Sequence, residues 1–394
     1  MISQTLYWYL GMRGLANFAM SLHFAIYTTF LLSRGLNLFE ANLVNLVFYA
    51  TLFVFELPTG AFADVFGRKT SVVISGVFNT AGTLAYFFAK SFWGFAAAES
   101  LLAVGSTFLS GAFAAWAVDR MRHFGHDGNT KNLFIKEQQV VVGVSIAGGL
   151  LGSLIATKSL SLTWLTSSAV FLFWTALAFL GLREEYFKRQ KLSFRAGFAA
   201  LKQTTRASIE FGIRHRTVRF ILLIGGLQYL CLMPGNMQWQ PWFGQFFHSV
   251  SSNGWLWVGM SAVILAGSSA AKTILSRFAG EDRALFYTQM LLGISLAGTV
   301  AFKALPLSLA VFMVHEFGRG LFKPIKDAYL NDQLPAKERA TVVSFEAISH
   351  HLGGGLGLVL SGWTALAFGI PATWLVFGLV LSFGSAAIYR FSRP

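Results

Sequence analysis

The chain has 394 residues, of which 55% are apolar and 12% are charged, whereas about 25% of residues are charged in a soluble domain. A soluble fold of this length needs more charge to cover its surface, and the mean hydropathy is +0.57. The composition therefore excludes a soluble protein and predicts an integral membrane protein. The apolar runs continue for about 20 residues, which favours membrane-spanning helices over the alternating segments of a β-barrel.

The apolar runs predict twelve membrane-spanning helices. In chain order the predicted spans cover residues 6–32, 40–62, 70–90, 92–118, 136–157, 160–181, 218–247, 252–276, 283–303, 305–330, 339–368 and 371–391. The first run lacks the basic region and the cleavage site of a signal peptide, so we expect it to be retained as a helix.

The long polar connection at 182–217 divides the chain into two six-helix halves, 1–181 and 218–394. Within this connection, Phe194 and Phe198 recur at helical spacing among basic residues. This pattern predicts a cytoplasmic amphipathic helix that lies on the membrane surface.

The net charge of +14 is concentrated in alternate loops. One set of loops carries 22 lysines and arginines, and the other set carries only Arg34, Lys90, Lys158 and Lys303. The positive-inside rule therefore predicts that both termini are cytoplasmic. Loop charge of this kind accounts for the basic balance without a nucleic-acid partner.

The two halves resemble each other in sequence. Glu99 in the fourth predicted span and Glu316 in the tenth stand 217 residues apart, and glycine-rich segments occupy 148–152 in the fifth span and 353–357 in the eleventh. Such duplication is common in secondary transporters, which hold their substrate between repeats near the bilayer midplane.

The loop between the second and third predicted spans carries the most specific motif. It reads Gly60-Ala-Phe-Ala-Asp64-Val-Phe-Gly67-Arg68-Lys69, and it resembles the G-x-x-x-D-x-x-G-R-K signature of the major facilitator superfamily. With twelve spans in two similar halves, the resemblance covers the whole chain. It implies an all-α fold of two six-helix bundles, related by a pseudo-two-fold axis around a central cavity. The segments near Pro58 and Arg339 resemble bacterial efflux-type members, which implies the bacterial cytoplasmic (inner) membrane.

The same loop supplies the predicted gate, or latch. Asp64 ends a helix and can accept hydrogen bonds from a facing helix N-terminus, Gly67 permits a tight turn, and Arg68 can bridge Asp64 to Asp119. The resemblance implies that such a cluster holds the cytoplasmic sides of the halves together in the outward-open state. The alternative is a solvated turn. Glu56 is a further candidate for gating or helix packing.

Ionisable residues inside membrane spans are costly and usually face a cavity or a partner. Eight are assigned to the spans: Arg13, Glu56, Glu99, Glu316, Arg319, Lys323, Lys326 and Asp327. The equal number of acids and bases predicts internal pairing.

Glu99 is the main candidate for proton coupling because apolar residues flank it on both sides. Desolvation favours its protonated form, and a nearby cation favours its ionised form. The alternative is a static ion pair with Arg13. Glu316 and His315 are further proton-coupling candidates, although Glu316 can also pair with Arg319.

The span at 218–247 carries Pro234 and Pro241 among amides and indoles. This composition predicts an interrupted helix that lines a cavity, with an interfacial aromatic belt as the alternative. Together with polar residues of the first span, the substrate-cavity candidates are Arg13, Asn17, Tyr27, Gln228, Asn236, Gln238 and Trp239.

The sequence contains no Walker loop, metal-ligand cluster or nucleophile elbow, so we predict neither an enzyme nor a metal or cofactor site. We predict a monomeric, proton-coupled antiporter that works by alternating access and exports a small amphiphilic organic molecule, such as a drug or a siderophore-like metabolite. Its partners are then the substrate, protons and membrane lipid. Alternatives are uptake or exchange of an organic anion on Arg13, Lys323 and Lys326, a lipid flippase, and a non-transporting sensor or scaffold.

Overall fold

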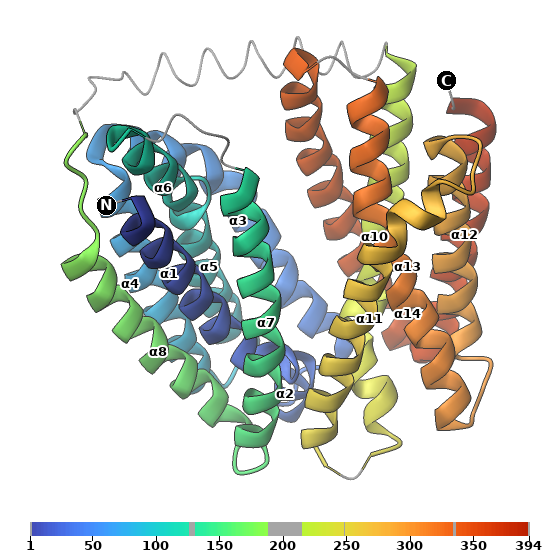
Figure 1. Cartoon of the computed structure of the whole chain (residues 1–394). Helices are drawn as coiled ribbons and strands as arrows, with labels where there is room; N and C mark the ends of the chain where they lie inside the picture. Colours follow the sequence, from blue (N-terminus) through green and yellow to red (C-terminus); the bar gives the residue numbers. More distant parts are fainter. Residues whose placement is uncertain (1, 126–130, 188–214, 248, 334–335, 393–394) are drawn as a thin grey trace. The chain divides into compact units, whose positions relative to one another are not determined.

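The computed structural model describes residues 2–125, 131–187, 215–247, 249–333 and 336–392, and these residues form helices joined by short turns (Figure 1). The first half contains α1 (Ile2–Phe24), α2 (Tyr27–Ser33), α3 (Leu38–Phe66), α4 (Arg68–Phe88), α5 (Phe92–Leu109), α6 (Ala112–His123), α7 (Lys131–Ala156) and α8 (Leu160–Gly181). The second half contains α10 (Arg216–Gly244), α11 (Ser251–Leu275), α12 (Glu281–Thr299), α13 (Leu305–Gln333) and α14 (Ala336–Ser392).

Helices occupy all the positions at which an apolar run predicts a span. Within the described ranges, eight helical segments are long and apolar enough to cross a membrane, or nine when α1 and α2 count as one span bent by 45°. The fold is therefore an all-helical membrane fold.

The difference between nine and twelve spans has two physical reasons. First, α14 contains two predicted spans, which are separated at Gly369 by a positive φ of 82° that favours glycine. Second, α12 and α13 are not among the apolar segments. The first turn of α12 is acidic, and the ionisable residues from Glu316 to Asp327 make α13 more polar than an ordinary span.

The chain divides into two compact units. The first comprises Met1–Leu36, Val44–Phe198 and Ser249–Val258, and the second comprises Asn37–Leu43, Ala199–His248 and Gly259–Pro394. Most of the predicted linker at 182–217, with its amphipathic helix, falls on 188–214 and so lies outside the described residues. That helix stays a prediction.

The two units repeat one packing scheme, which supports the predicted duplication. In the first unit α1 packs against α7, and α4 packs against α5 and α8. In the second unit α10 packs against α14, and α12 packs against α13 and α14. Because α14 contains both the fifth and the sixth span of its half, each of these helix pairs in one unit has its counterpart in the other.

The glycine-rich segments lie where helix backbones approach closely. A Cβ atom on Gly152 of α7 would collide with the Leu22 carbonyl of α1, and one on Gly353 of α14 would collide with the Gly226 carbonyl of α10. Small residues allow membrane helices to pack in this way. The glycines therefore fix the α1–α7 and α10–α14 pairs.

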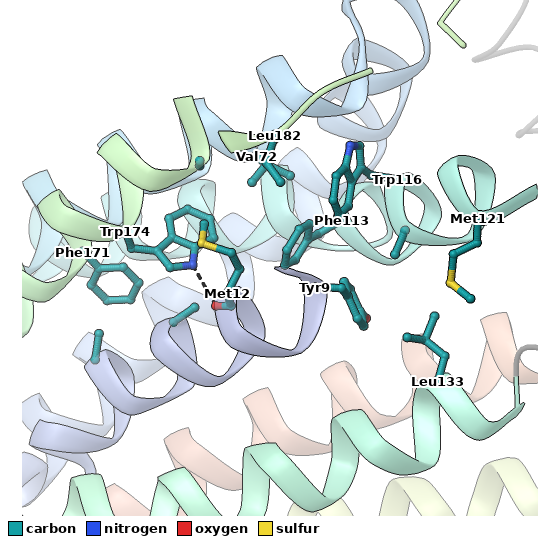
Figure 2. Packing of buried hydrophobic residues seen from close by; sticks show 14 residues of the cluster. Tyr9, Met12, Val72, Phe113, Trp116, Met121, Leu133, Phe171, Trp174 and Leu182 are labelled. Atoms are coloured by element: carbon teal, nitrogen blue, oxygen red, sulfur yellow. Dashed lines mark hydrogen bonds between the residues drawn. The ribbon is translucent and has the colours of Figure 1, made fainter. Parts of the chain in front are cut away.

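Each unit has its own apolar core. In the first unit, Trp174 of α8 donates its indole N–H to the Met12 carbonyl of α1 at 2.8 Å, and Tyr9 packs on Phe113 with ring centroids 4.9 Å apart (Figure 2). The core of the second unit includes Phe220 and other buried side chains of α10, α12, α13 and α14. These cores hold the helices that carry the polar residues described next.

One predicted break in a helix is wrong. Pro234 and Pro241 both lie inside α10, which continues from Arg216 to Gly244. Neighbouring helices can satisfy the backbone groups that a proline frees, so a membrane helix tolerates it. The break occurs instead between α1 and α2, at Ala25 and Ile26.

Candidate functional site

A buried carboxylate lies in the first unit, beside the break between α1 and α2. Glu99 of α5 is 4% exposed. The Tyr27 hydroxyl donates to its Oε1 at 2.5 Å, and the Tyr86 hydroxyl and the Asn45 side chain also hydrogen-bond to it. Glu99 therefore gathers three neutral polar groups from α2, α3 and α4.

Aromatic rings surround this carboxylate. The indole of Trp164 lies between His23 and Tyr86, with ring centroids 4.0 Å and 3.8 Å away. The Tyr27 and Tyr86 hydroxyl oxygens are 3.4 Å apart. Within the part of the chain that the structure describes, Glu99 forms no ion pair. The site is thus a carboxyl group held by neutral donors in an apolar surrounding.

The static ion pair between Glu99 and Arg13, which was the alternative to proton coupling, is not formed. Arg13 of α1 instead pairs with Glu137 of α7, with 2.6 Å between Nε and Oε1, and the Tyr9 hydroxyl donates to the other oxygen of Glu137 at 2.5 Å. The Asn17 amide donates to the Arg13 carbonyl at 2.8 Å, within α1. The sequence count of span charges omits Glu137, which stands at the start of its run.

The predicted latch centres on the turn between α3 and α4. Gly67 has φ 96° and precedes α4, where a glycine avoids backbone strain. The Arg68 side chain forms the predicted ion pair with Asp119 of α6. Asp64 is exposed and lines a pocket of about 240 Å³ together with Arg68, Asp119 and Glu184.

Glu184 is a member of this cluster that the sequence analysis did not identify. Its carboxylate accepts hydrogen bonds from the backbone N–H groups of Arg68 at 2.8 Å and Lys69 at 3.1 Å. Gly67 has no side chain to cap α4, and an anion at a helix N-terminus is stabilised by the free N–H groups and the helix dipole. Glu184 lies within the predicted linker, whose charges were assigned to the cytoplasmic surface.

Hydrogen bonds and an ion pair hold the segment that carries Glu184 against α6. The Trp116 indole donates to the Arg183 carbonyl at 2.9 Å, and Arg120 pairs with Glu185 at 3.2 Å. The Tyr186 hydroxyl donates to the Trp116 carbonyl at 3.2 Å. Burial, reinforced by the Glu184 carboxylate, raises the pKa of Tyr186, so this hydroxyl stays a donor.

Glu56 accepts a hydrogen bond from the Ser110 hydroxyl at 2.7 Å. Its side chain is exposed on α3, and Ser110 lies in the turn between α5 and α6. This contact fits a helix-packing role for Glu56.

The charged residues of α13 from Glu316 to Asp327 form ion pairs. The Arg319 guanidinium donates to both oxygens of Glu316 at 2.9 Å, as the spacing of three residues predicts. His315, which is buried, has Nδ1 3.0 Å from the Leu292 carbonyl oxygen. Lys323 pairs with Asp327 at 2.6 Å.

Lys326 forms its ion pair with Glu346 of α14, a buried residue that the count of span charges also omits. With Glu137 and Glu346 included, the equal count of acids and bases no longer holds. The prediction that these charges pair internally nevertheless holds for the ion pairs named above.

The polar residues of α10 lie mostly inside the second unit. Gln238 is fully buried; it donates to the Ser361 carbonyl at 3.2 Å and accepts from the Trp374 indole at 3.0 Å, which links α10 to α14. Gln228 and Trp239 are also buried. Asn236 is only half-buried.

Comparisons with known proteins identify similar chains. A family model described as Major Facilitator Superfamily matches residues 240–394. The uncharacterized MFS-type transporter YxaM of Bacillus subtilis (strain 168) is 23% identical over 385 residues, which cover 95% of this chain and 92% of that protein. The multidrug efflux pump Tap of Mycolicibacterium fortuitum is 23% identical over 359 residues, covering 89% and 87%.

Solved structures share the fold. The nucleoside transporter NupG has a TM-score of 0.76 at 13% identity and covers 98% of this chain and 99% of its own. A bacterial homolog of the human lysosomal transporter Spinster has a TM-score of 0.77 at 13% identity and covers 100% and 97%. At this identity the likeness shows the architecture, which extends over the whole chain.

Proposed function

We propose that the chain is a member of the major facilitator superfamily and a proton-coupled antiporter, which exports a small amphiphilic organic molecule, such as a drug or a siderophore-like metabolite, by alternating access. The family model that matches residues 240–394 and the likeness in fold to solved transporters support the family. The similarity to a multidrug efflux pump supports the direction and the class of substrate. The observation that carries the proposal is the buried Glu99, held by neutral donors and by no cation among the described residues.

The groups around Glu99 can serve both of its protonation states. A carboxylate accepts hydrogen bonds from the hydroxyls of Tyr27 and Tyr86. A carboxylic acid donates one, and a tyrosine hydroxyl can rotate to accept it. Burying an ionised carboxyl without a cation is costly, so protonation relieves the charge and a cationic substrate can compensate it. A group with these properties can exchange a proton for substrate.

The organic-anion alternative receives less support. Its three candidate cations each have a carboxylate partner: Arg13 with Glu137, Lys323 with Asp327, and Lys326 with Glu346. An anionic substrate would have to displace these carboxylates, and for the buried Lys326–Glu346 pair the removal of one partner is strongly unfavourable.

The test is transport of ethidium by proteoliposomes under an imposed pH gradient. Glu99→Gln cannot exchange a proton, so we expect it to abolish gradient-driven ethidium accumulation while ethidium counterflow persists. Tyr27→Phe is the matched control, because it removes one donor and keeps the carboxyl group; it should slow transport and remain coupled. If Glu99→Gln still accumulates ethidium against its gradient, the proton carrier must be sought at Glu316 or His315.

The proposal includes a cytoplasmic gate and a location. Asp64, Gly67, Arg68 and Asp119 are assigned to the gate, which the family signature and the Arg68–Asp119 ion pair support. We place the chain as a monomer in the bacterial cytoplasmic membrane. The excess of basic residues in alternate loops supports the placing of both termini in the cytoplasm.

A further inference from the structure

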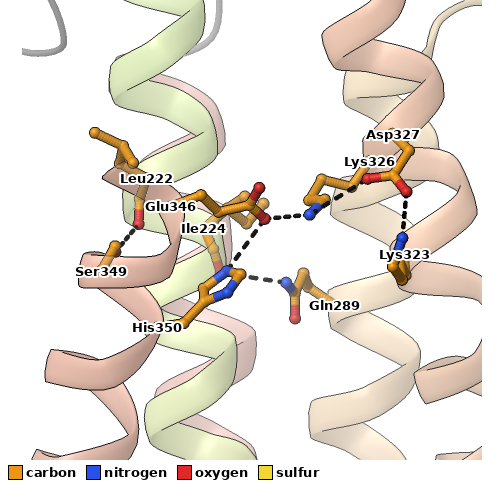
Figure 3. A network of polar contacts seen from close by, with 9 residues as sticks. All are labelled: Leu222, Ile224, Gln289, Lys323, Lys326, Asp327, Glu346, Ser349 and His350. Atoms are coloured by element: carbon orange, nitrogen blue, oxygen red, sulfur yellow. Dashed lines mark hydrogen bonds and ion pairs between the residues drawn. The ribbon is translucent and has the colours of Figure 1, made fainter. Parts of the chain in front are cut away.

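A buried ion pair links α13 to α14 in the second unit (Figure 3). Glu99 belongs to the first unit. Lys326 of α13 contacts Glu346 of α14, and their side chains are 9% and 5% exposed. Losing one partner of a buried pair leaves the other charge uncompensated. The pair therefore holds the two helices together as long as neither residue has another partner.

Both residues of the pair have such a partner on their own helix. Lys326 Nζ lies 3.4 Å from Oδ1 of Asp327, which is also on α13. Glu346 Oε1 lies 3.2 Å from Nε2 of His350, one turn further along α14. The Asp327 carboxylate is now shared with Lys323, whose side chain is 79% exposed and can be solvated instead. Two pairings of the same charges are thus available, one between the helices and one within each helix.

The protonation state of His350 can determine which of these pairings forms, because its ring contacts Glu346. Its ring stacks on Tyr229 of α10, with centroids 3.9 Å apart and planes 13° apart, and its side chain is 14% exposed. Histidine is the side chain that gains charge near neutral pH. A neutral His350 leaves Lys326 as the counter-ion of Glu346. A protonated His350 puts two cations on one buried carboxylate, and like charges at such a site repel.

Among the side chains that the structure describes, the other groups around Glu346 do not offer a competing switch. From α13 it faces Lys326, with Lys323, Asp327 and Arg319 nearby, and Arg319 is held by Glu316. From α10 it faces the Tyr229 hydroxyl. From α12 comes Gln289, which is neutral and donates to the Ile224 carbonyl at 3.4 Å (Figure 3).

We infer that Lys326, Glu346 and His350 form a second proton-binding site, which releases α13 from α14 when it takes up one proton. The proton adds to the free ring nitrogen of His350, the imidazolium then pairs with Glu346 on α14, and Lys326 moves to Asp327 on α13. No bond other than the new N–H forms or breaks. The link between the helices is lost, while Lys326 and Glu346 each keep a charged partner and the exposed Lys323 is solvated.

The test measures the distance between α13 and α14 in the full chain by double electron–electron resonance. Spin labels are placed at the exposed positions Gln333 and Ala347, after the buried Cys231 is replaced by alanine. Acidification from about pH 8 to about pH 5 should raise the ratio of separated to linked molecules about tenfold. An unchanged distance distribution overturns the inference.

Two variants separate the roles of the residues. His350→Gln keeps the ion pair and cannot take up the proton, so it should stay linked at both pH values. Glu346→Gln removes the link, so it should be separated at both. A pH response like that of the unmutated chain in either variant overturns the inference, and His350→Gln alone decides the matter if Glu346→Gln does not fold. Glu281→Gln, a carboxyl group outside the network, is the matched control and should respond normally.

The measurement needs neither substrate nor a proton gradient, so it does not depend on the proposed export. Repeating it in Glu99→Gln separates the two proposals. The response should persist in that background, since Glu99 belongs to the other unit. A response that disappears with Glu99 would assign the proton to Glu99 and overturn the second site.

Discussion

At the scale of single residues, the contact between Arg13 and Glu137 offers a direct energetic test. Both side chains are mostly shielded, at 29% and 13% exposure. Glu137→Gln leaves the partly exposed Arg13 charge without its partner, and we expect a loss of about 1–3 kcal/mol in unfolding free energy. The measurement is SDS-induced unfolding of the purified protein in mixed micelles.

The double variant Arg13→Gln and Glu137→Gln is the control for this pair. Because it removes both charges together, its loss in unfolding free energy should be smaller than the sum of the losses in the two single variants. Additive losses would show that the ion pair contributes nothing beyond its separate side chains. The Tyr9 hydroxyl remains next to position 137 in every variant of the cycle.

Sequence patterns predicted individual residues unevenly. The i, i+3 pair of Glu316 and Arg319 and the Arg68–Asp119 pair follow from spacing and from a family signature. The ion pairs of Glu137 and Glu346 were not predicted, because both residues stand near span ends, where a charge is expected to face water. Glu184 was not predicted because it binds the backbone N–H groups at the N-terminus of α4, more than 100 residues earlier in the chain. The spacing of side chains does not reveal such a contact.

At the scale of helices, the close contact between α1 and α7 is testable through two glycines of α7. Gly152→Ala places a methyl group against the Leu22 carbonyl, and overpacking of this kind costs about 1–3 kcal/mol. We expect a lower midpoint of SDS-induced unfolding and a loss of folded protein on heating.

Gly143→Ala is the matched control on the same helix, because a Cβ atom there meets no other atom within 4 Å. It should leave stability unchanged or raise it by up to about 1 kcal/mol, since alanine favours a helix over glycine. Equal effects of the two substitutions would contradict the close α1–α7 contact.

Helices were more predictable than their interruptions. Continuous apolar runs indicate where helices lie, because the membrane requires every backbone group to be satisfied internally. Whether a proline interrupts a helix depends on its neighbours. Pro234 and Pro241 therefore sit inside an unbroken α10, whereas the break after α1 falls at Ala25 and Ile26, where no proline or glycine marks it.

At the scale of the whole molecule, the proposed gate predicts a change in the balance of conformations. Asp64→Asn or Arg68→Ala should leave the helices intact and favour the inward-open state by about 1–3 kcal/mol. The readout is labelling of single cysteines introduced on the cytoplasmic side, which should become faster. Lys69→Ala is the control in the same turn, and unchanged labelling together with normal transport would refute the gate.

The orientation of the whole chain follows from its loop charges and can be measured independently of transport. Lys90 lies in the turn between α4 and α5, and Lys158 lies in the turn between α7 and α8. These turns belong to the loops that hold four basic residues against 22 in the others, so the positive-inside rule places them outside the cytoplasm.

Alkaline phosphatase, which is active only outside the cytoplasm, should therefore be active when fused after Lys90 or Lys158. It should be inactive when fused after Gly125 or after Phe187, where a green fluorescent protein fusion should fluoresce. A single reversed result would invalidate the alternation of spans, and with it the assignment of both termini to the cytoplasm.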